Sequence, residues 1–256
     1  MPKRHLLRVN KTQRLSKLFS ELFLNTSCSI CDLEHFISHD IPLCQSCFQK
    51  LTWITGNFCL RCGVPFHEEN KKQTFCPHCS DELPPFDLCR SILYYHDTTD
   101  SLIKAFKYGK NWRLSKYFSR LLFDYYQNHL IKFGHDVIIY IPSHYIKNFK
   151  RGFNQSYLLA KGLSNKTGIP CSIELIKKIK ESKSQTTLHK EERKLNIAGV
   201  FCIDRNRETI KGKKLLIIDD IVTTGATVEE VSSLLREFSP ALIHVLSLAR
   251  TPLGRK

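Results

Sequence analysis

Short apolar runs separated by amphipathic stretches fill the chain from about residue 88 to its end. The runs at 91–95, 137–141, 214–219 and 243–248 have the length and composition of buried strands. Apolar residues recur at helical spacing between them, at 100–106, 113–131, 154–166 and 228–237. Strands that alternate with helices form a parallel sheet with helices on its faces. The pattern therefore predicts an α/β domain over residues 88–256, with ligands bound beyond the carboxyl ends of its strands.

The strand predicted at 214–219 ends in an acid pair, Asp219 and Asp220, followed by a small, hydroxyl-rich stretch. That stretch contains Thr223, Thr224, Gly225, Ala226 and Thr227. A helix start favours phosphate through its free N–H groups and its dipole, the threonines add donors, and glycine permits close backbone approach. The carboxylates, expected in an exposed loop, can accept hydrogen bonds from vicinal hydroxyls. One loop would therefore hold a ribose by its hydroxyls and by its 5-phosphate.

This order of acids, threonines and glycine resembles the signature of type I phosphoribosyltransferases, in which two acids precede a T-T-G-x-T loop. The resemblance implies binding of phosphoribosyl pyrophosphate, and Mg²⁺ would bridge the pyrophosphate and the ribose hydroxyls. If the sugar reacts, a nucleophile displaces pyrophosphate at the anomeric carbon while Asp219 and Asp220 orient the ribose. An ordinary βα turn with a capping aspartate explains one acid and one threonine, but not two acids with three threonines around a glycine.

A second strand end supplies candidates for the pyrophosphate. Pro142 and Ser143 form a turn after the strand predicted at 137–141, and two lysines and Arg151 follow. Pyrophosphate needs several donors because of its charge. We therefore expect Pro142 and Ser143 at the phosphates, and Arg151 at the pyrophosphate.

Residues 180–200 are polar and rich in lysine, which is typical of a mobile loop that excludes water from a reacting site. Lys183 is a further candidate for phosphate binding, and His189, Lys190 and Arg193 could add positive charge near a departing pyrophosphate. A solvated surface loop would have the same composition, so both interpretations stay open for each of these residues.

The chain of 256 residues carries 39 Lys and Arg against 24 Asp and Glu, a formal net charge of +15. This balance favours polyanionic partners, namely nucleic acid, an acidic membrane face or phosphorylated small molecules, although a lysine-rich proteome would give the same excess. The sequence contains no run of about 18 apolar residues and no apolar signal-peptide segment with a cleavage site. These features predict a cytoplasmic protein whose cysteines stay reduced.

Eight cysteines form four C-x2-C pairs. The pairs are Cys28 with Cys31, Cys44 with Cys47, Cys59 with Cys62, and Cys76 with Cys79. Each pair fits a knuckle that points two thiolates at one metal, and four thiolates with no open position favour structural zinc over an iron–sulfur cluster. The spacing predicts a small N-terminal domain, a double zinc ribbon over residues 28–82 with two zinc ions. Sequential and crossed pairings of the knuckles are both compatible with it.

The first 27 residues and the ribbons are candidates for contacts with larger partners. Residues 1–27 form a basic amphipathic helix in this prediction, which could lie on an anionic membrane surface or pack against the rest of the chain. Phe48, Trp53 and Phe58 in the ribbons could contact single-stranded nucleic acid. Packing of these rings around the metal sites is the favoured interpretation.

Short motifs along most of the chain resemble the ComF family. They are FKYG at 106–109, RGFNQ at 151–155, Q-T-x-L at 185–188, R-x-x-N at 193–196 and LAR at 248–250. The T-T-G-x-T stretch at 223–227, called the phosphate loop below, also matches. That family couples a double zinc ribbon to a phosphoribosyltransferase domain, and its members are tied to natural competence. The resemblance implies uptake of single-stranded DNA with other competence proteins, at the inner face of the cytoplasmic membrane.

Two functions remain open from the sequence. In the first, a competence-associated protein for DNA uptake binds phosphoribosyl pyrophosphate through a phosphoribosyltransferase domain. In the second, the chain is an active phosphoribosyltransferase of nucleotide metabolism with no direct role in DNA handling. No motif identifies an acceptor base, and a fold can keep a ligand site while losing its chemistry. The sequence therefore does not decide whether turnover occurs.

Overall fold

The computed structural model describes residues 27–32, 37–38, 40–66, 74–108, 112–142, 154–172, 175–180, 199–203 and 210–252. The helix predicted at 1–27 and the loop predicted at 180–200 lie almost entirely outside these ranges. Ser143, Arg151 and Lys183 lie outside them as well. Among the described residues, no helix combines the length and the hydropathy that crossing a bilayer requires.

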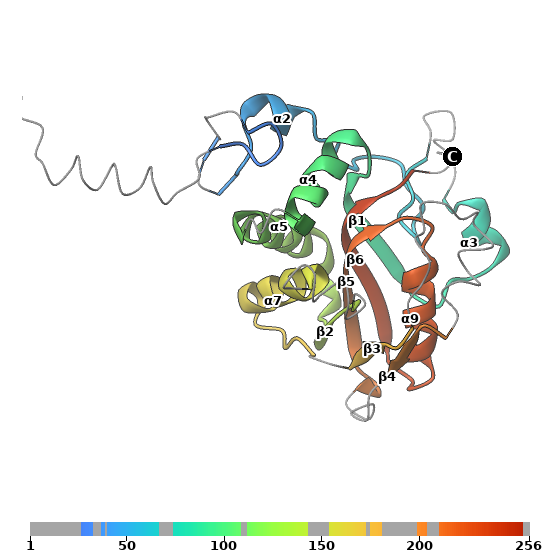
Figure 1. Ribbon diagram of the computed structural model, residues 1–256. Coiled ribbons are helices and arrows are strands. Elements are labelled where there is room, and N and C mark those ends of the chain that lie inside the picture. The colour runs from blue at the N-terminus through green and yellow to red at the C-terminus, as the bar shows by residue number, and fades with distance from the viewer. Residues whose placement is uncertain are drawn as a thin grey trace, which may run out of the picture.

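A four-stranded parallel sheet forms the centre of the described structure (Figure 1). Its order is β1 (Leu88–Tyr94), β6 (Leu242–Arg250), β5 (Lys214–Val222) and β2 (Val137–Tyr140). All three neighbouring pairs are parallel. The two central strands are buried on both faces, which explains their continuous apolar runs. The predicted parallel α/β fold is confirmed.

Helices cover both faces of the sheet (Figure 1). On one face lie α4 (Asp97–Tyr108), α5 (Trp112–Tyr125) and α7 (Gln155–Thr167), and on the other lies α9 (Ala226–Arg236). α5 continues into a π-helical turn, η2 (Tyr126–Leu130), and a 3-10 turn, η3 (Ile131–Phe133). The helix predicted at 113–131 therefore exists, but its hydrogen bonding changes at Tyr126.

The side chains of β5 divide the core into two halves, because successive residues of a strand point to opposite faces. Leu216 and Ile218 belong to the hydrophobic cluster beneath α4, α5 and α7. Leu215 and Ile217 belong to the cluster beneath α9, which contributes Val231. Full burial of each such side chain stabilises the fold by about 1.5–3 kcal/mol.

A second sheet, which the sequence analysis did not predict, packs beside α9. Its strands β3 (Ile176–Lys178) and β4 (Phe201–Ile203) are antiparallel. Phe201 is buried in the cluster beneath α9, and Gly199 N–H donates to Glu230 Oε1 of that helix at 2.8 Å. Each strand spans three residues, too few for an alternating pattern to stand out in the sequence.

The cysteine-rich segment lies along the outer edge of β1. Ile54 N–H donates to Ile92 O at 2.9 Å, and Cys89 N–H donates to Arg61 O at 2.7 Å. An edge strand otherwise leaves such groups without a partner in the sheet. The segment therefore extends the hydrogen bonding of the sheet as well as carrying the predicted metal sites.

Candidate functional site

The two predicted ribose acids lie within β5 and not in a loop after it. The prediction ended this strand at Asp219 and placed both acids in an exposed loop. The strand continues because it keeps its pairing with β6, from Asp219 opposite Ser247 to Val222 opposite Arg250. Asp219 keeps only 8% of its surface exposure. The expectation of exposed loop acids is therefore wrong.

Two hydrogen bonds hold the carboxyl group of Asp219. Ser156 Oγ, in the first turn of α7, donates to Asp219 Oδ1 at 3.2 Å, and Asp220 N–H donates to the same oxygen at 2.9 Å. Burial, followed by the negative charge of Asp220, raises the pKa of Asp219 to about 8. A raised pKa means that the carboxyl group keeps its proton to higher pH than an exposed one, and its protonated form can both donate and accept a hydrogen bond with sugar hydroxyls.

Asp220 faces a group of charged side chains on α4. Its Oδ2 lies 2.6 Å from Lys107 Nζ, and the two side chains keep 14% and 20% of their exposure. One turn earlier, Lys104 pairs with Asp100 at 2.7 Å, and Tyr95 OH donates to Asp100 Oδ1 at 2.6 Å. Sequence reasoning gave Lys107 no role, although it belongs to the FKYG stretch at 106–109. That stretch was the available signal for its place in the site.

The residues after β5 form a tight turn into α9. Gly225 precedes the helix with a φ of 93°, in the left-handed region that glycine adopts without strain. Ala226 N–H, at the first helical position, donates to Thr224 Oγ1 at 3.5 Å. The N-terminus of an 11-residue helix therefore opens directly after the strand that carries the two acids. This arrangement can bind an anion next to a group that binds hydroxyls.

Pro142 lies at the same end of the sheet as the acid pair, beyond the carboxyl end of β2. Ile141 N–H donates to Ile218 O at 3.1 Å, so the next residue comes beside the end of β5. The other residues predicted at the phosphates of the second strand end lie outside the described residues. The pyrophosphate side of the site therefore stays a prediction.

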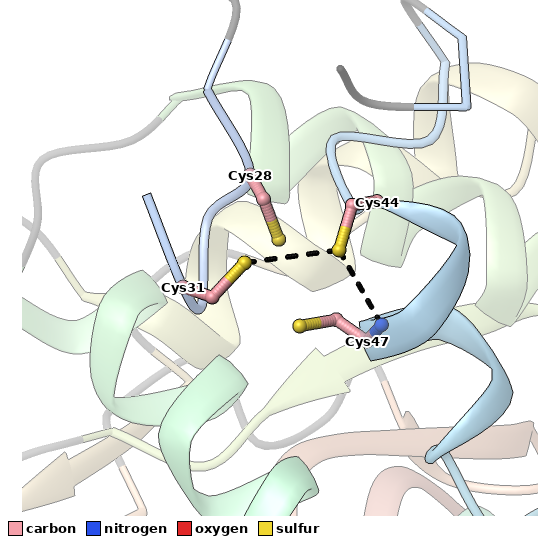
Figure 2. Close-up of side chains that lie close together, drawn as sticks. All are labelled: Cys28, Cys31, Cys44 and Cys47. Carbon is pink, nitrogen blue, oxygen red and sulfur yellow. Dashed lines mark hydrogen bonds between the residues drawn. The ribbon is translucent and has the colours of Figure 1, made fainter. Parts of the chain in front are cut away.

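The eight predicted zinc ligands converge in two groups of four, with sequential pairing of the knuckles. The groups are Cys28, Cys31, Cys44 and Cys47, and Cys59, Cys62, Cys76 and Cys79. Figure 2 shows the first group, whose sulfur atoms point toward a common centre. The sulfur atoms of each group lie within 4.8 Å of one another, with 3.7 Å between Cys31 and Cys44. Thiolates bound to tetrahedral zinc through bonds of about 2.3 Å are about 3.8 Å apart, so both tetrads fit structural zinc.

The thiols of a tetrad ionise together only around a cation. Burial, followed by hydrogen bonds with neighbouring sulfur atoms, raises the pKa of Cys47. The hydrogen bond with Cys59, followed by burial, raises the pKa of Cys62. Zinc removes this penalty because it binds the deprotonated thiolates. The short helices α2 (Gln45–Gln49) and α3 (Pro77–Asp81) hold the last cysteine of each tetrad in place.

The two tetrads differ in burial and in the charges beside them. The first is partly exposed, whereas all four cysteines of the second are buried. Arg250 keeps 5% of its exposure, and its positive charge favours the thiolate of Cys62. Arg90 donates from Nη2 to Leu60 O, inside the third knuckle, at 2.8 Å. Because a zinc ion with four thiolates carries a net charge of about −2, these two guanidinium groups offset the charge of a buried centre.

The three ribbon side chains considered for nucleic-acid contact, Phe48, Trp53 and Phe58, are each partly buried. The ring centroids of Phe48 and Trp53 are 6.1 Å apart, and both rings lie partly buried against the cluster beneath α4, α5 and α7. The guanidinium of Arg90 lies 4.8 Å from the centroid of the Phe58 ring. These contacts favour the packing interpretation over exposed stacking platforms for nucleic acid.

Two family models match the chain. The Phosphoribosyl transferase domain matches residues 151–256, and the Double zinc ribbon domain matches residues 19–80. Fold and site together define a phosphoribosyltransferase-type α/β protein with an N-terminal double zinc ribbon. The double zinc ribbon and the phosphoribosyltransferase domain that the ComF-like motifs predicted are both matched, and homologues that are named competence proteins align with the chain.

Curated relatives align along most of the chain. Competence protein F of Haemophilus influenzae is 28% identical over 89% of this chain and 98% of its own length. DNA utilization protein YhgH of Escherichia coli K12 is 27% identical over 88% of this chain and 96% of its own. Competence protein ComFC of Bacillus subtilis is 29% identical over 77% of this chain and 79% of its own.

Solved structures of lower similarity also align. The allosteric regulatory enzyme of purine biosynthesis is 21% identical over 52% of this chain, with a TM-score of 0.37. This chain spans 26% of that enzyme. The purine phosphoribosyltransferase of Pyrococcus horikoshii Ot3 is 21% identical over 52% of this chain and 74% of its own, with a TM-score of 0.31.

Proposed function

We propose that this chain is a competence-associated protein whose phosphoribosyltransferase domain binds phosphoribosyl pyrophosphate with Mg²⁺. The observation that carries the proposal is the position of Asp219 and Asp220 at the end of β5, directly before the helix start at Gly225. One element supplies partners for sugar hydroxyls, and the next supplies N–H donors for a 5-phosphate. A phosphorylated ribose needs both kinds of group at adjacent positions.

Each part of the proposed complex has its own residues. Asp219 and Asp220 orient the ribose, and residues 223–227 hold the 5-phosphate. Lys107 balances the negative charge of Asp220, which would otherwise repel the pyrophosphate. Mg²⁺ comes with the ligand and is coordinated mostly by ligand oxygens and water. Arg151, Ser143 and Lys183 are proposed for the pyrophosphate on the sequence argument alone.

The competence role rests on the relatives. Two of them are named competence proteins and one is named a DNA utilization protein, and they align over 77–89% of this chain. The net charge of +15 supports an interaction with DNA, which would take place in the cytoplasm, beside the membrane and other competence proteins. The proposal is limited to ligand binding, because a retained site does not establish turnover.

A thermal-shift measurement on the full-length, zinc-loaded chain tests ligand binding. Phosphoribosyl pyrophosphate with Mg²⁺, at about 100 times its Kd, is expected to raise the free energy of unfolding by about 2.7 kcal/mol. Ribose 5-phosphate shares the hydroxyls and the 5-phosphate and is expected to stabilise the chain to a smaller extent. Free pyrophosphate stabilising the chain as much as phosphoribosyl pyrophosphate would contradict a ribose site.

A transformation assay separates the competence role from the alternative in nucleotide metabolism. The chromosomal copy is replaced by the Asp219→Ala/Asp220→Ala variant, and protein levels are matched to wild type. If ligand binding serves DNA uptake, the transformation frequency is expected to fall while growth on minimal medium stays normal. Unchanged transformation together with a nucleotide requirement would favour the metabolic alternative.

A further inference from the structure

One side-chain pair joins the second zinc ribbon to the first turn of α9, which follows the phosphate loop at residues 223–227. His78 Nε2 lies 2.9 Å from Glu229 Oε1, with the imidazole N–H donating to the carboxylate. His78 lies between Cys76 and Cys79 in α3, and Glu229 lies in the first turn of α9. The two side chains keep 20% and 16% of their exposure. The contact is therefore shielded from solvent more than a surface ion pair is.

Glu229 brings a negative charge to the edge of the loop. Its Oε1 lies 3.2 Å from the position that a Cβ on Gly225 would occupy, and its own N–H donates to Gly225 O at 2.9 Å. The helix dipole that favours a phosphate at this terminus favours a carboxylate there as well. Glu229 is therefore an internal anion beside the position proposed for the 5-phosphate, and its charge opposes that of the ligand.

We propose that His78 positions Glu229 and thereby sets the affinity of the loop for the 5-phosphate, an inference that rests on the proposed function. The hydrogen bond holds the carboxylate toward the ribbon and disperses part of its negative charge. Without this bond, the carboxylate turns toward the N–H groups of the loop and competes with the phosphate. The second ribbon thus acts on ligand binding as a positioning element, in addition to stabilising the fold.

Calorimetric titration of the full-length, zinc-loaded protein tests this role, with ribose 5-phosphate and with phosphoribosyl pyrophosphate plus Mg²⁺ as ligands. His78→Ala is expected to raise the Kd of both ligands by the same factor, about three- to tenfold, because both carry the 5-phosphate. Glu229→Gln is expected to bind at least as tightly as wild type. In the double variant His78→Ala/Glu229→Gln, the affinity is expected to equal that of Glu229→Gln, because the competing charge is gone.

Matched variants separate positioning from damage to the ribbon. His78→Gln keeps an N–H donor near the position of Nε2 and is expected to restore most of the affinity. Glu230→Gln removes the same charge from the adjacent residue, whose carboxylate binds Gly199 N–H, and is expected to leave the affinity unchanged. Elemental analysis must give wild-type zinc content for each variant. Glu229→Gln lies outside the ribbon and keeps the test valid if His78→Ala loses zinc.

The outcomes distinguish this inference from the proposed function. Equal losses in His78→Ala and in the double variant would mean that His78 acts through the structure of the ribbon, which overturns the inference alone. The same follows if wild type binds both ligands and neither substitution changes their Kd. If wild type binds neither ligand, the proposed function fails, and this inference fails with it.

Discussion

Lys107 Nζ and Asp220 Oδ2 are 2.6 Å apart, and this ion pair joins the last turn of α4 to the end of β5. The carboxylate of Asp220 has a cation beside it, whereas the neighbouring carboxyl of Asp219 is buried and accepts two hydrogen bonds. The two adjacent acids therefore offer different chemistry to a ligand. The balanced charge of Asp220 and the raised pKa of Asp219 both lower the repulsion that two adjacent acids exert on an anion, as the proposed binding of a polyanionic sugar phosphate requires.

Lys107→Ala is expected to weaken binding of phosphoribosyl pyrophosphate by about tenfold, because Asp220 loses the cation that balances its negative charge and then repels the pyrophosphate. The affinity for ribose 5-phosphate, which lacks the pyrophosphate, is expected to fall less. Lys104→Ala is the matched control, since Lys104 is 65% exposed and pairs with Asp100 on the same helix. Equal effects of the two substitutions would assign the loss to net charge and not to the position of Lys107.

Asp219→Asn is expected to stabilise the fold at alkaline pH. The pKa of Asp219 is raised from 3.8 to about 8 in the folded state. The contribution of this group to the free energy of unfolding is therefore fully present below pH 3.8 and is lost as the pH rises through 8. Asparagine keeps an acceptor for Ser156 without ionising. Urea unfolding at pH 9 is expected to give a free energy of unfolding that is higher in the variant than in wild type by on the order of 1–3 kcal/mol. A variant less stable than wild type at that pH would contradict the buried, protonated state.

Cys62→Ser and Cys31→Ser are each expected to lower the zinc content from two ions to one, by elemental analysis. Cys62→Ser is expected to destabilise the chain more, because Cys62 is buried in the cluster beneath α9 while Cys31 is exposed. Thermal unfolding compares the two variants. Unchanged metal content in Cys62→Ser would reject the assignment of the second tetrad.

Acid is expected to destabilise the fold through a buried histidine pair at the opposite end of the sheet. His135 Nε2 lies 3.0 Å from His244 Nδ1, and burial is the largest cause that lowers the pKa of each to about 4. The unfolded histidines bind protons at higher pH, so stability is complete above pH 6.5 and is lost as pH falls toward 4. Lowering the pH from 7 to 5 is expected to reduce the free energy of unfolding by roughly 2–4 kcal/mol through this pair.

His244→Gln isolates this effect, because the zinc ligands titrate equally in the variant and in wild type. Its free energy of unfolding is expected to change less between pH 7 and pH 5. Wild type and variant with the same pH dependence would show that other groups control the acid transition.

The residues proposed for the ribose and the 5-phosphate could be identified from the sequence because they are contiguous in the chain. The apolar run, the acid pair, the glycine and the following helix all lie within residues 215–231, so local pattern alone orders them. The groups that complete the site come from elsewhere. Ser156 and Lys107 reach the acids from α7 and α4, and only the packing of those helices on the sheet brings them there.

Two features of the fold were missed for different physical reasons. The carboxylate of Asp219 suggested a loop, but the ladder with β6 continues past it and buries it opposite Ser247. β3 and β4 are too short to show a period, and they owe their stability to burial of Phe201 beneath α9. The cysteine spacing predicted both tetrads, whereas the choice of sequential pairing depends on how the knuckles fold.

Calorimetric titration with phosphoribosyl pyrophosphate and Mg²⁺, beside the Asp219→Ala/Asp220→Ala variant, tests the central claim most directly. We predict saturable binding of one ligand per wild-type chain and no measurable binding by a folded, zinc-loaded variant. Binding by the variant with the wild-type Kd, or no binding by zinc-loaded wild type, would contradict the assignment of these two acids and the following loop as a phosphoribosyl site.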